Sequence, residues 1–239
     1  MIKQSENLIY GRNPVKEALR SNRVVKIYTT SNFSDATILP LIKQSKAVVN
    51  YVTPKELDES CSGVHQGIAA EVKPYSYASM EQILHAAKQE KKPIIVLLDG
   101  INDPHNLGAI LRSCDVFGVT GVIMSKHNQV MLNATVAKTS AGAINFVPVA
   151  LVSNLNNAIR TLKDNGFWIV SSDGSGTTDY TQVKYDFPTA LVVGSEGQGI
   201  SQLVLKNSDF IVKIPMYGKV NSLNASVAAG IFLARIKES

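Results

Sequence analysis

The sequence predicts an α/β fold, with a small N-terminal α/β domain followed by a larger domain built on a mostly parallel sheet. Short apolar runs alternate with helical patterns along the chain, which is typical of this class. The composition changes once, at a polar segment from Lys88 to Pro93 that ends in a helix breaker. A chain of 239 residues is long enough for two folded units. We therefore expect domains over residues 1–75 and 94–239, joined by a linker over residues 76–93.

The N-terminal domain is expected to open with a helix and a strand. Asn13 can cap a helix that has Pro14 at its first position, and residues 24–29 alternate like a half-buried strand. The pattern then predicts a second round: a helix over residues 34–46, a strand over residues 48–52, a short helix after Pro54 and a strand over residues 67–72.

Four basic residues of this domain recur at helical spacing, namely Arg12, Lys16, Arg20 and Arg23. If the segment is helical, they share one face. Residues 1–92 hold 13 Lys and Arg against 9 Asp and Glu, so this part carries most of the net charge of +5. Such a face suits the phosphate backbone of a nucleic acid. A solvated helix surface without a ligand is the alternative that charge alone leaves open.

The second domain is expected to be a parallel sheet with helices on both faces. From Ile94 onward, the apolar runs IIVLL, GVIM, FVPVA, FWIVSS, TALVVG and FIVKIP are separated by helical patterns. The first of these helices has a stripe at three-four spacing, made of Leu107, Ile110, Leu111, Cys114 and Phe117. Cys114 is therefore expected in the core. Both Cys61 and Cys114 are expected as free thiols, because a chain of this size needs no covalent staple.

Composition narrows the class of protein. Hydrophobic residues make up 45% and charged residues 18% of the chain, as in ordinary folded proteins. The longest apolar runs fall far short of the roughly 20 residues that cross a bilayer, and the N-terminus lacks a signal-peptide core. No Cys and His cluster has the spacing of metal ligands. We expect a cytoplasmic protein without a membrane span and without a metal.

The loops that follow the strands are where chemistry is expected in an open parallel sheet. Three loops stand out: DGINDPHNLGAILR over residues 99–112, GSEGQGIS over 194–201 and MYGKVNSLNAS over 216–226. Arg112 can present several donors to a carboxylate or a phosphate, and glycines in the second loop let the backbone approach a ligand. Taken singly, each loop has a simpler explanation: a surface arginine, a tight turn, and a helix cap by Ser222 or Asn224.

Taken together and in this order, NLGAILR, GSEGQGIS and IPMYGKVNSLNASVAA resemble the three signature motifs of the SpoU or TrmH family of RNA ribose 2′-O-methyltransferases. The resemblance spans residues 94–235. The segments IYGRNPVKEAL and HQGIAA resemble the small substrate-binding domain of that family. The chain is most similar to the bacterial members that methylate a guanosine ribose in 23S rRNA.

The resemblance implies a fold, a cofactor and a site. The fold is a SPOUT-type parallel-sheet domain whose C-terminal segment threads a loop as a deep trefoil knot, and family members are typically homodimers with the pocket near the interface. The cofactor is S-adenosyl-L-methionine. The positions implied for catalysis or substrate placement are Asn106, Arg112, Glu196, Ser222 and Asn224. The positions implied for cofactor binding, largely through the backbone, are Gly194, Ile214 and Leu223.

The role of Arg112 needs a physical hypothesis, because a guanidinium is almost never deprotonated near neutral pH. We expect Arg112 to hold a substrate phosphate or the developing alkoxide, with Glu196 fixing Arg112. Asn106 and Asn224 would orient the nucleotide. The expected substrate is rRNA first and tRNA second.

Two other classes of function remain to be weighed. The first is an RNA-binding protein that assists ribosome assembly without catalysis, although a pure binder does not need these polar pocket residues. The second is a Rossmann-type enzyme that acts on a small molecule. That class predicts a glycine fingerprint near Asp99 and an acidic residue about 20 residues later, and the sequence has neither.

Overall fold

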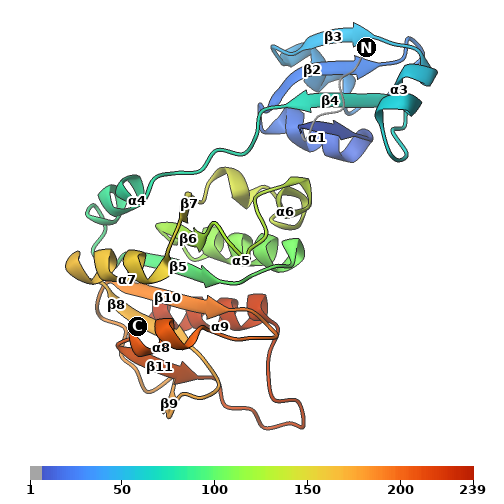
Figure 1. Ribbon diagram of the computed structural model, residues 1–239. Coiled ribbons are helices and arrows are strands. Elements are labelled where there is room, and N and C mark those ends of the chain that lie inside the picture. The colour runs from blue at the N-terminus through green and yellow to red at the C-terminus, as the bar shows by residue number, and fades with distance from the viewer. Residues whose placement is uncertain (1–6) are drawn as a thin grey trace. The chain divides into compact units, whose positions relative to one another are not determined.

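The computed structural model describes residues 7–239, and the chain divides into two compact units between Ser76 and Tyr77 (Figure 1). The first unit contains β1 (Leu8–Tyr10), α1 (Arg12–Arg20), β2 (Val24–Thr29), α2 (Leu39–Gln44), β3 (Val48–Tyr51), α3 (Pro54–Ser60) and β4 (Ile68–Val72). Its sheet has the order β1-β4-β2-β3, in which β2 and β3 are parallel and β4 is antiparallel to both of its neighbours. The core of this unit is formed by Val15, Leu19, Ile27, Ile38 and Ile68.

The helix α1 differs from its prediction at both ends. It begins at Arg12 after Gly11, whose φ of 92° only glycine adopts readily, so Asn13 is not the cap. The chain leaves the helix after Arg20, and Arg23 lies beyond a left-handed turn at Asn22. The predicted four-residue basic face is therefore wrong at Arg23.

Arg23 has a structural role instead. Its guanidinium carbon lies 3.3 Å from the centre of the Tyr75 ring, and its Nη2 donates to the carbonyl oxygen of Lys73 at 2.6 Å. Both partners come from the segment that follows β4. Arg12, Lys16 and Arg20 remain on the helix.

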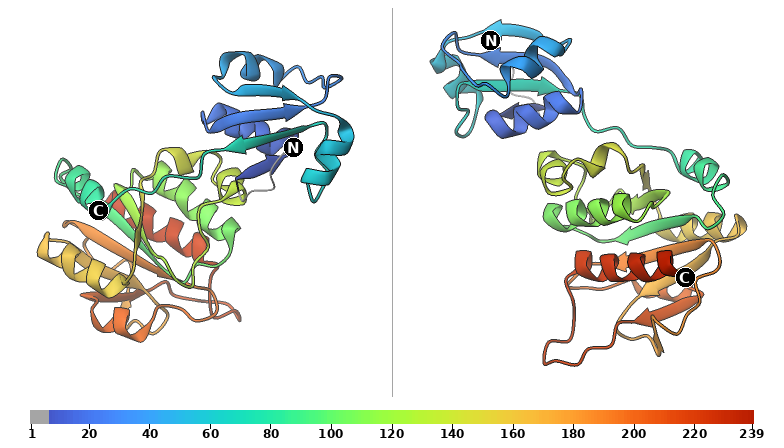
Figure 2. Two further views of the ribbon diagram at one scale, coloured as in Figure 1. Left: turned by 45° about the horizontal axis from the view of Figure 1, so that its top comes forward. Right: turned by 180° about the vertical axis from the view of Figure 1, so that it is seen from behind.

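The second unit is a seven-stranded sheet with helices on both faces, as the sequence predicts (Figure 2). Its elements are α4 (Met80–Ala87), β5 (Ile94–Asp99), α5 (Pro104–Val116), β6 (Gly121–Ser125), α6 (Ala134–Thr139), β7 (Val149–Val152), α7 (Leu155–Asp164), β8 (Trp168–Ser172), β9 (Thr178–Asp179), β10 (Thr189–Gly194), α8 (Gln202–Lys206), β11 (Phe210–Lys213) and α9 (Ala225–Glu238). The strand order is β7-β6-β5-β10-β8-β11-β9, and every neighbouring pair is parallel.

The segment predicted as a linker over residues 76–93 is not one, because it contains α4. Ser79 and Gln82 form a capping box at its start, and Ile83 is only 1% exposed within the core beneath α7 and α8. A Cβ atom at Gly121 would lie 2.7 Å from the Ile83 side chain, which shows how closely α4 meets β6. The helix has only eight residues, and its apolar stripe is too short for the sequence pattern to reveal it.

The strand order positions the three loops. Strand β10 lies between β5 and β8, and Gly194 at its carboxyl end is opposite Asp99 at the end of β5. On one face of the sheet, α9 packs against both α5 and β10. The loops after β5 and β10 and the start of α9 therefore meet at one edge of the sheet.

Candidate active site

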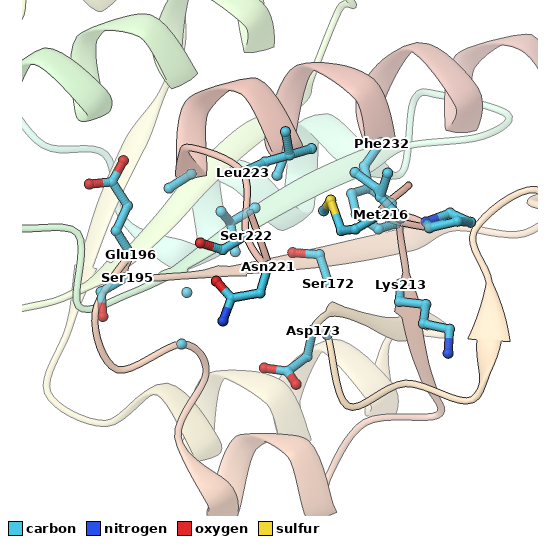
Figure 3. Close-up of a pocket in the computed structure, with 18 residues that line it drawn as sticks. Ser172, Asp173, Ser195, Glu196, Lys213, Met216, Asn221, Ser222, Leu223 and Phe232 are labelled. Atoms are coloured by element: carbon cyan, nitrogen blue, oxygen red, sulfur yellow. The ribbon is translucent and has the colours of Figure 1, made fainter. Parts of the chain in front are cut away.

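A pocket of about 490 Å³ opens beyond the carboxyl ends of β8, β10 and β11 (Figure 3). The segments that follow these three strands supply most of its wall, and the start of α9 closes it. Val193, Ile214, Leu223 and Phe232 provide apolar surface. Figure 3 shows Glu196 at one end of the pocket and Lys213 at the other. The pocket therefore combines an apolar wall with charged groups at its ends.

The glycine-rich loop after β10 is a tight turn that lies against this pocket. Ser195 and Gly199 exchange backbone hydrogen bonds of 3.2 and 2.9 Å. A Cβ atom at Gly194 would overlap the backbone of Gly199, so the turn can close only over a glycine. Glu196 is carried by this turn and lines the pocket. The segment is therefore a tight turn, which was the simpler explanation of its glycines. It also lies at the pocket, where its backbone can approach a ligand.

Glu196 is held by two amides from distant parts of the chain. Asn106 Nδ2 donates to Glu196 Oε1 at 3.1 Å, and Asn224 Nδ2 donates to the same oxygen. Asn224 Nδ2 also donates to Asn106 Oδ1 at 2.8 Å. Asn106 is only 8% exposed, whereas Glu196 and Asn224 are exposed, so the cluster has a buried side at Asn106 and an open side at the other two residues. The three side chains form a cluster that we call the Glu196 cluster.

Asn224 has a second function in the same structure. Its Oδ1 accepts hydrogen bonds from the backbone amides of Ser226 at 2.9 Å and Val227 at 3.2 Å, which caps α9. Asn224 is therefore a helix cap, as the sequence allowed, but capping uses only its side-chain oxygen. The amide nitrogen of the same side chain faces the Glu196 cluster.

The structure brings together most of the residues that the sequence singled out. Gly194, Glu196, Ile214, Ser222 and Leu223 line the pocket, and Asn106 and Asn224 adjoin it through Glu196. Arg112 does not line it. The side chain is exposed on α5, and it makes no hydrogen bond or ion pair to residues 7–239.

The expected contact between Glu196 and Arg112 is therefore wrong in this structure. Asn106 and Arg112 are six residues apart on one helix, which separates them by about 9 Å along the axis and by about 120° around it. Glu196 meets the face that carries Asn106. Arg112 points away from that face toward solvent.

Two charged residues of the pocket were missed by the sequence analysis. Asp173 follows β8, and its Oδ1 accepts hydrogen bonds from the Ser175 amide at 2.9 Å and the Ser175 hydroxyl at 2.6 Å. Lys213 ends β11. Both line the pocket. Both lie at the carboxyl end of a strand, where sites are expected, but neither belongs to one of the three motif loops.

Within residues 7–239, no group of three or more His, Cys, Asp or Glu side chains is arranged to hold a metal ion. No helix in this range is long and apolar enough to span a membrane. Cys61 and Cys114 are both buried and free, as expected.

Comparison with known proteins decides the family. Residues 93–234 match the SpoU rRNA Methylase family, and residues 8–78 match the family described as RNA 2′-O ribose methyltransferase substrate binding. The chain belongs to the SpoU methylase family. The resemblance seen in the sequence is thereby confirmed, whereas the particular similarity to enzymes of 23S rRNA stays a prediction. The α/β architecture is that of SpoU methyltransferases.

Relatives from bacteria support this membership along nearly the whole chain. A protein of Staphylococcus saprophyticus described as a TrmH family tRNA/rRNA methyltransferase is 44% identical over 97% of this chain and 95% of its own. YacO of Bacillus subtilis, described in the same way, is 40% identical over 98% of this chain and 96% of its own. This SpoU methylase is accordingly an RNA methyltransferase.

Solved structures share its fold. The SpoU methyltransferase AviRb of Streptomyces viridochromogenes, in complex with AdoMet, has a TM-score of 0.77 at 23% identity and covers 97% of this chain and 89% of its own. An AdoMet-bound rRNA methyltransferase of Sinorhizobium meliloti has a TM-score of 0.73 at 21% identity, over 97% and 86% of the two chains. S-adenosylmethionine is the cofactor of this methyltransferase family.

Proposed function

We propose that this SpoU methylase transfers a methyl group from S-adenosylmethionine to a ribose 2′-hydroxyl of structured RNA, with a guanosine of 23S rRNA as the first candidate. The observation that carries the proposal is the Glu196 cluster at the end of the pocket. Methyl transfer to a hydroxyl requires an oxygen that is aligned for in-line attack, and a preorganised polar cluster supplies that alignment.

The pocket fits the cofactor by its chemistry. S-adenosylmethionine supplies an electrophilic methyl group on a sulfonium, and it also carries an ammonium group and a carboxylate. The carboxylates of Asp173 and Glu196 suit its cationic groups, and Lys213 suits its carboxylate. Ile214 and Leu223 offer apolar surface for the adenine, while Gly194 brings backbone close to it.

Glu196 has one oxygen left for the substrate. Both amides of the cluster donate to Oε1, whereas Oε2 makes no hydrogen bond within residues 7–239. Oε2 can accept a hydrogen bond from the ribose 2′-hydroxyl and orient its lone pair toward the methyl group. The two amides anchor Oε1 and so restrict the positions that Oε2 can take. Ser222 lines the same pocket and can donate to the nucleotide.

Arg112 is proposed to hold the RNA from outside the pocket. A solvent-exposed guanidinium that has no hydrogen-bond or ion-pair partner within residues 7–239 suits a phosphate of the substrate, since its planar fork matches phosphate oxygens. The substrate-binding domain over residues 8–78 supports RNA as the partner.

We also propose a homodimer that works in the cytoplasm. Val116 on α5 is 70% exposed and Val227 on α9 is 49% exposed, on two helices that pack together. Burial of these side chains against a second copy would remove apolar surface from water. The deep trefoil knot implied by the resemblance stays a prediction.

The test is transfer of radiolabelled methyl from S-adenosylmethionine to total rRNA and to total tRNA, with Arg112→Ala measured beside the wild type. The product is mapped by the resistance of a 2′-O-methylated ribose to nuclease. Label at one ribose of 23S rRNA, lost in the variant, is expected. Label on tRNA alone would move the substrate to tRNA. RNA binding without any transfer would favour the role of an assembly factor.

A further inference from the structure

The N-terminal unit has a pocket of its own at the carboxyl ends of β2 and β3. Its volume is about 180 Å³, and it lies between these strands and α2. We call it the Tyr51 pocket, after the side chain that ends β3. The two strands are parallel, and open α/β sheets bind ligands beyond the carboxyl ends of such strands. The location is therefore one at which a ligand is expected.

The walls of the Tyr51 pocket combine rings, aliphatic surface and polar groups that have no hydrogen-bond partner within residues 7–239. Tyr51 is 74% exposed, and Phe33 is half-buried. The Thr30 hydroxyl, the Lys43 ammonium and the Tyr51 hydroxyl make no hydrogen bond within residues 7–239, and all three side chains line the pocket. Ring faces favour a flat ligand, and an ammonium favours an anion. A nucleotide has both features.

The pocket is supported from behind by the HQG segment, which resembles the small domain of the family. Gly67 has a φ of 81°, and a Cβ atom there would lie 3.3 Å from the Phe33 ring and 3.4 Å from the Thr30 hydroxyl. The carbonyl oxygen of Gly67 accepts hydrogen bonds from the Thr29 hydroxyl at 3.1 Å and the Thr30 amide at 3.2 Å. His65 Nδ1 accepts from the Gly67 amide at 3.0 Å. These contacts fix one wall of the pocket.

The segment IYGRNPVKEAL, which also resembles the small domain of the family, contributes the positive charge of Arg12 near the Tyr51 pocket. The Arg12 amide donates to Gln66 Oε1 at 3.0 Å, and the Arg12 guanidinium carbon lies 5.7 Å from the centre of the Phe33 ring. Asp35 lies 3.6 Å from the same guanidinium and offsets part of its charge. Lys43 has no such partner within residues 7–239. Positive charge beside an aromatic slot favours an RNA strand over an apolar peptide.

We propose that the Tyr51 pocket binds one unstacked nucleotide of the substrate RNA, with the base against Tyr51 and Phe33 and a phosphate near Lys43. The inference rests on the proposed function, because that function supplies RNA as the ligand. RNA is recognised mainly through unstacked bases in loops and bulges, which can enter a pocket of this kind. The pocket lies outside the methyl-transfer site, so it selects the RNA and takes no part in the chemistry.

The experiment measures the affinity of the full-length protein for deproteinised rRNA by filter binding at one fixed salt concentration. Tyr51→Ala is expected to weaken binding about tenfold, the loss typical of removing a ring that stacks on one base. Tyr51→Phe should bind as the wild type does. Phe146→Ala is the control, because Phe146 is equally exposed but lies far along the chain in the other unit.

A second pair of variants separates the pocket from general charge. Lys43→Ala and Lys46→Ala remove the same charge from one segment, but only Lys43 lines the pocket. Lys43→Ala is expected to weaken binding severalfold more than Lys46→Ala. Equal losses, or wild-type affinity in Tyr51→Ala, would overturn the proposal and leave a protein segment as the occupant to examine.

The affinity for S-adenosylmethionine, measured by calorimetry, should be unchanged in every one of these variants. A loss of cofactor binding in Tyr51→Ala would contradict a role confined to RNA. If the wild type binds rRNA and Tyr51→Ala binds it weakly, but neither transfers a methyl group, then the proposed function fails and the pocket stands. If the wild type transfers a methyl group and Tyr51→Ala binds rRNA with wild-type affinity, then the proposed function stands and the nucleotide-binding role of the Tyr51 pocket fails.

Discussion

Asn224 Nδ2 donates a hydrogen bond of 2.8 Å to Oδ1 of Asn106, although 118 positions separate the two residues in the chain. The bond joins the start of α9 to the start of α5. Both side chains also donate to Glu196 Oε1. Three motifs that are distant in sequence thus meet in one cluster of two amides and a carboxylate.

The two functions of Asn224 can be separated by Asn224→Ser. Serine is as good a helix cap as asparagine, so the melting temperature should stay within about 2 °C of the wild type. The serine lacks the amide donor to Glu196, so methyl transfer should fall about 100-fold, as when one preorganised donor is removed. Asn154→Ser at the cap of α7 is the matched control. Normal transfer by Asn224→Ser would exclude a catalytic function for the cluster.

Asp173→Asn should weaken cofactor binding about tenfold without disturbing the fold. Asparagine keeps the Oδ1 acceptor for Ser175, but it removes the charge that faces the cationic cofactor. The affinity for S-adenosylhomocysteine, whose sulfur is neutral, should fall less. Calorimetry with both compounds measures the difference. Asp186→Asn, an exposed change outside the pocket, controls for net charge; equal behaviour of the two variants would contradict the assignment.

Arg112→Lys tests whether Arg112 holds a phosphate through two parallel hydrogen bonds. The variant keeps the charge but loses the planar fork, so RNA affinity and turnover should both decline, by about tenfold in turnover. Stability should not change, because the side chain makes no hydrogen bond or ion pair within residues 7–239. Normal turnover with unchanged RNA affinity would show that bidentate positioning is wrong.

Gly108→Ala should destabilise the protein by about 1–3 kcal/mol through overpacking. A Cβ atom at Gly108 would overlap the Thr139 side chain, since α5 and α6 approach each other closely at this point. Urea unfolding measures the loss. In the double variant with Thr139→Ala, part of the stability should return, and strict additivity of the two changes would argue against this contact.

The stability of the protein should fall at alkaline pH in part because of Cys114. Burial raises the pKa of the Cys114 thiol well above its usual range, so the native protein keeps the proton where the unfolded chain loses it. The contribution is present below about pH 8.5 and is lost as the pH rises above that value, at no more than about 1.4 kcal/mol per pH unit. Unfolding of the wild type and of Cys114→Ala at pH 8 and pH 10 measures it. An equal pH dependence in both proteins would assign the effect to other groups.

Local patterns in the sequence were sufficient to predict most strands and helices of the second unit, and to single out the three loops that carry the motifs. The alternation of apolar runs and helical stripes predicts β5, β6, β8, β10 and β11 and the helices around them, because side-chain periodicity reports which face of an element is buried. It does not report a short helix such as α4, and it wrongly extended the basic face of α1 to Arg23. The motifs themselves were sufficient to indicate the family.

Only the tertiary structure decided which of these residues act together. Strand β10 lies beside β5 although 95 positions separate their paired residues, and this pairing places Glu196 against Asn106 and leaves Arg112 outside the pocket. The same strand order brings Asp173 and Lys213 into the pocket. Periodicity is a local property, whereas the order of strands depends on the packing of the whole sheet. The sequence therefore determined the candidate residues, and the packing of the sheet determined their partners.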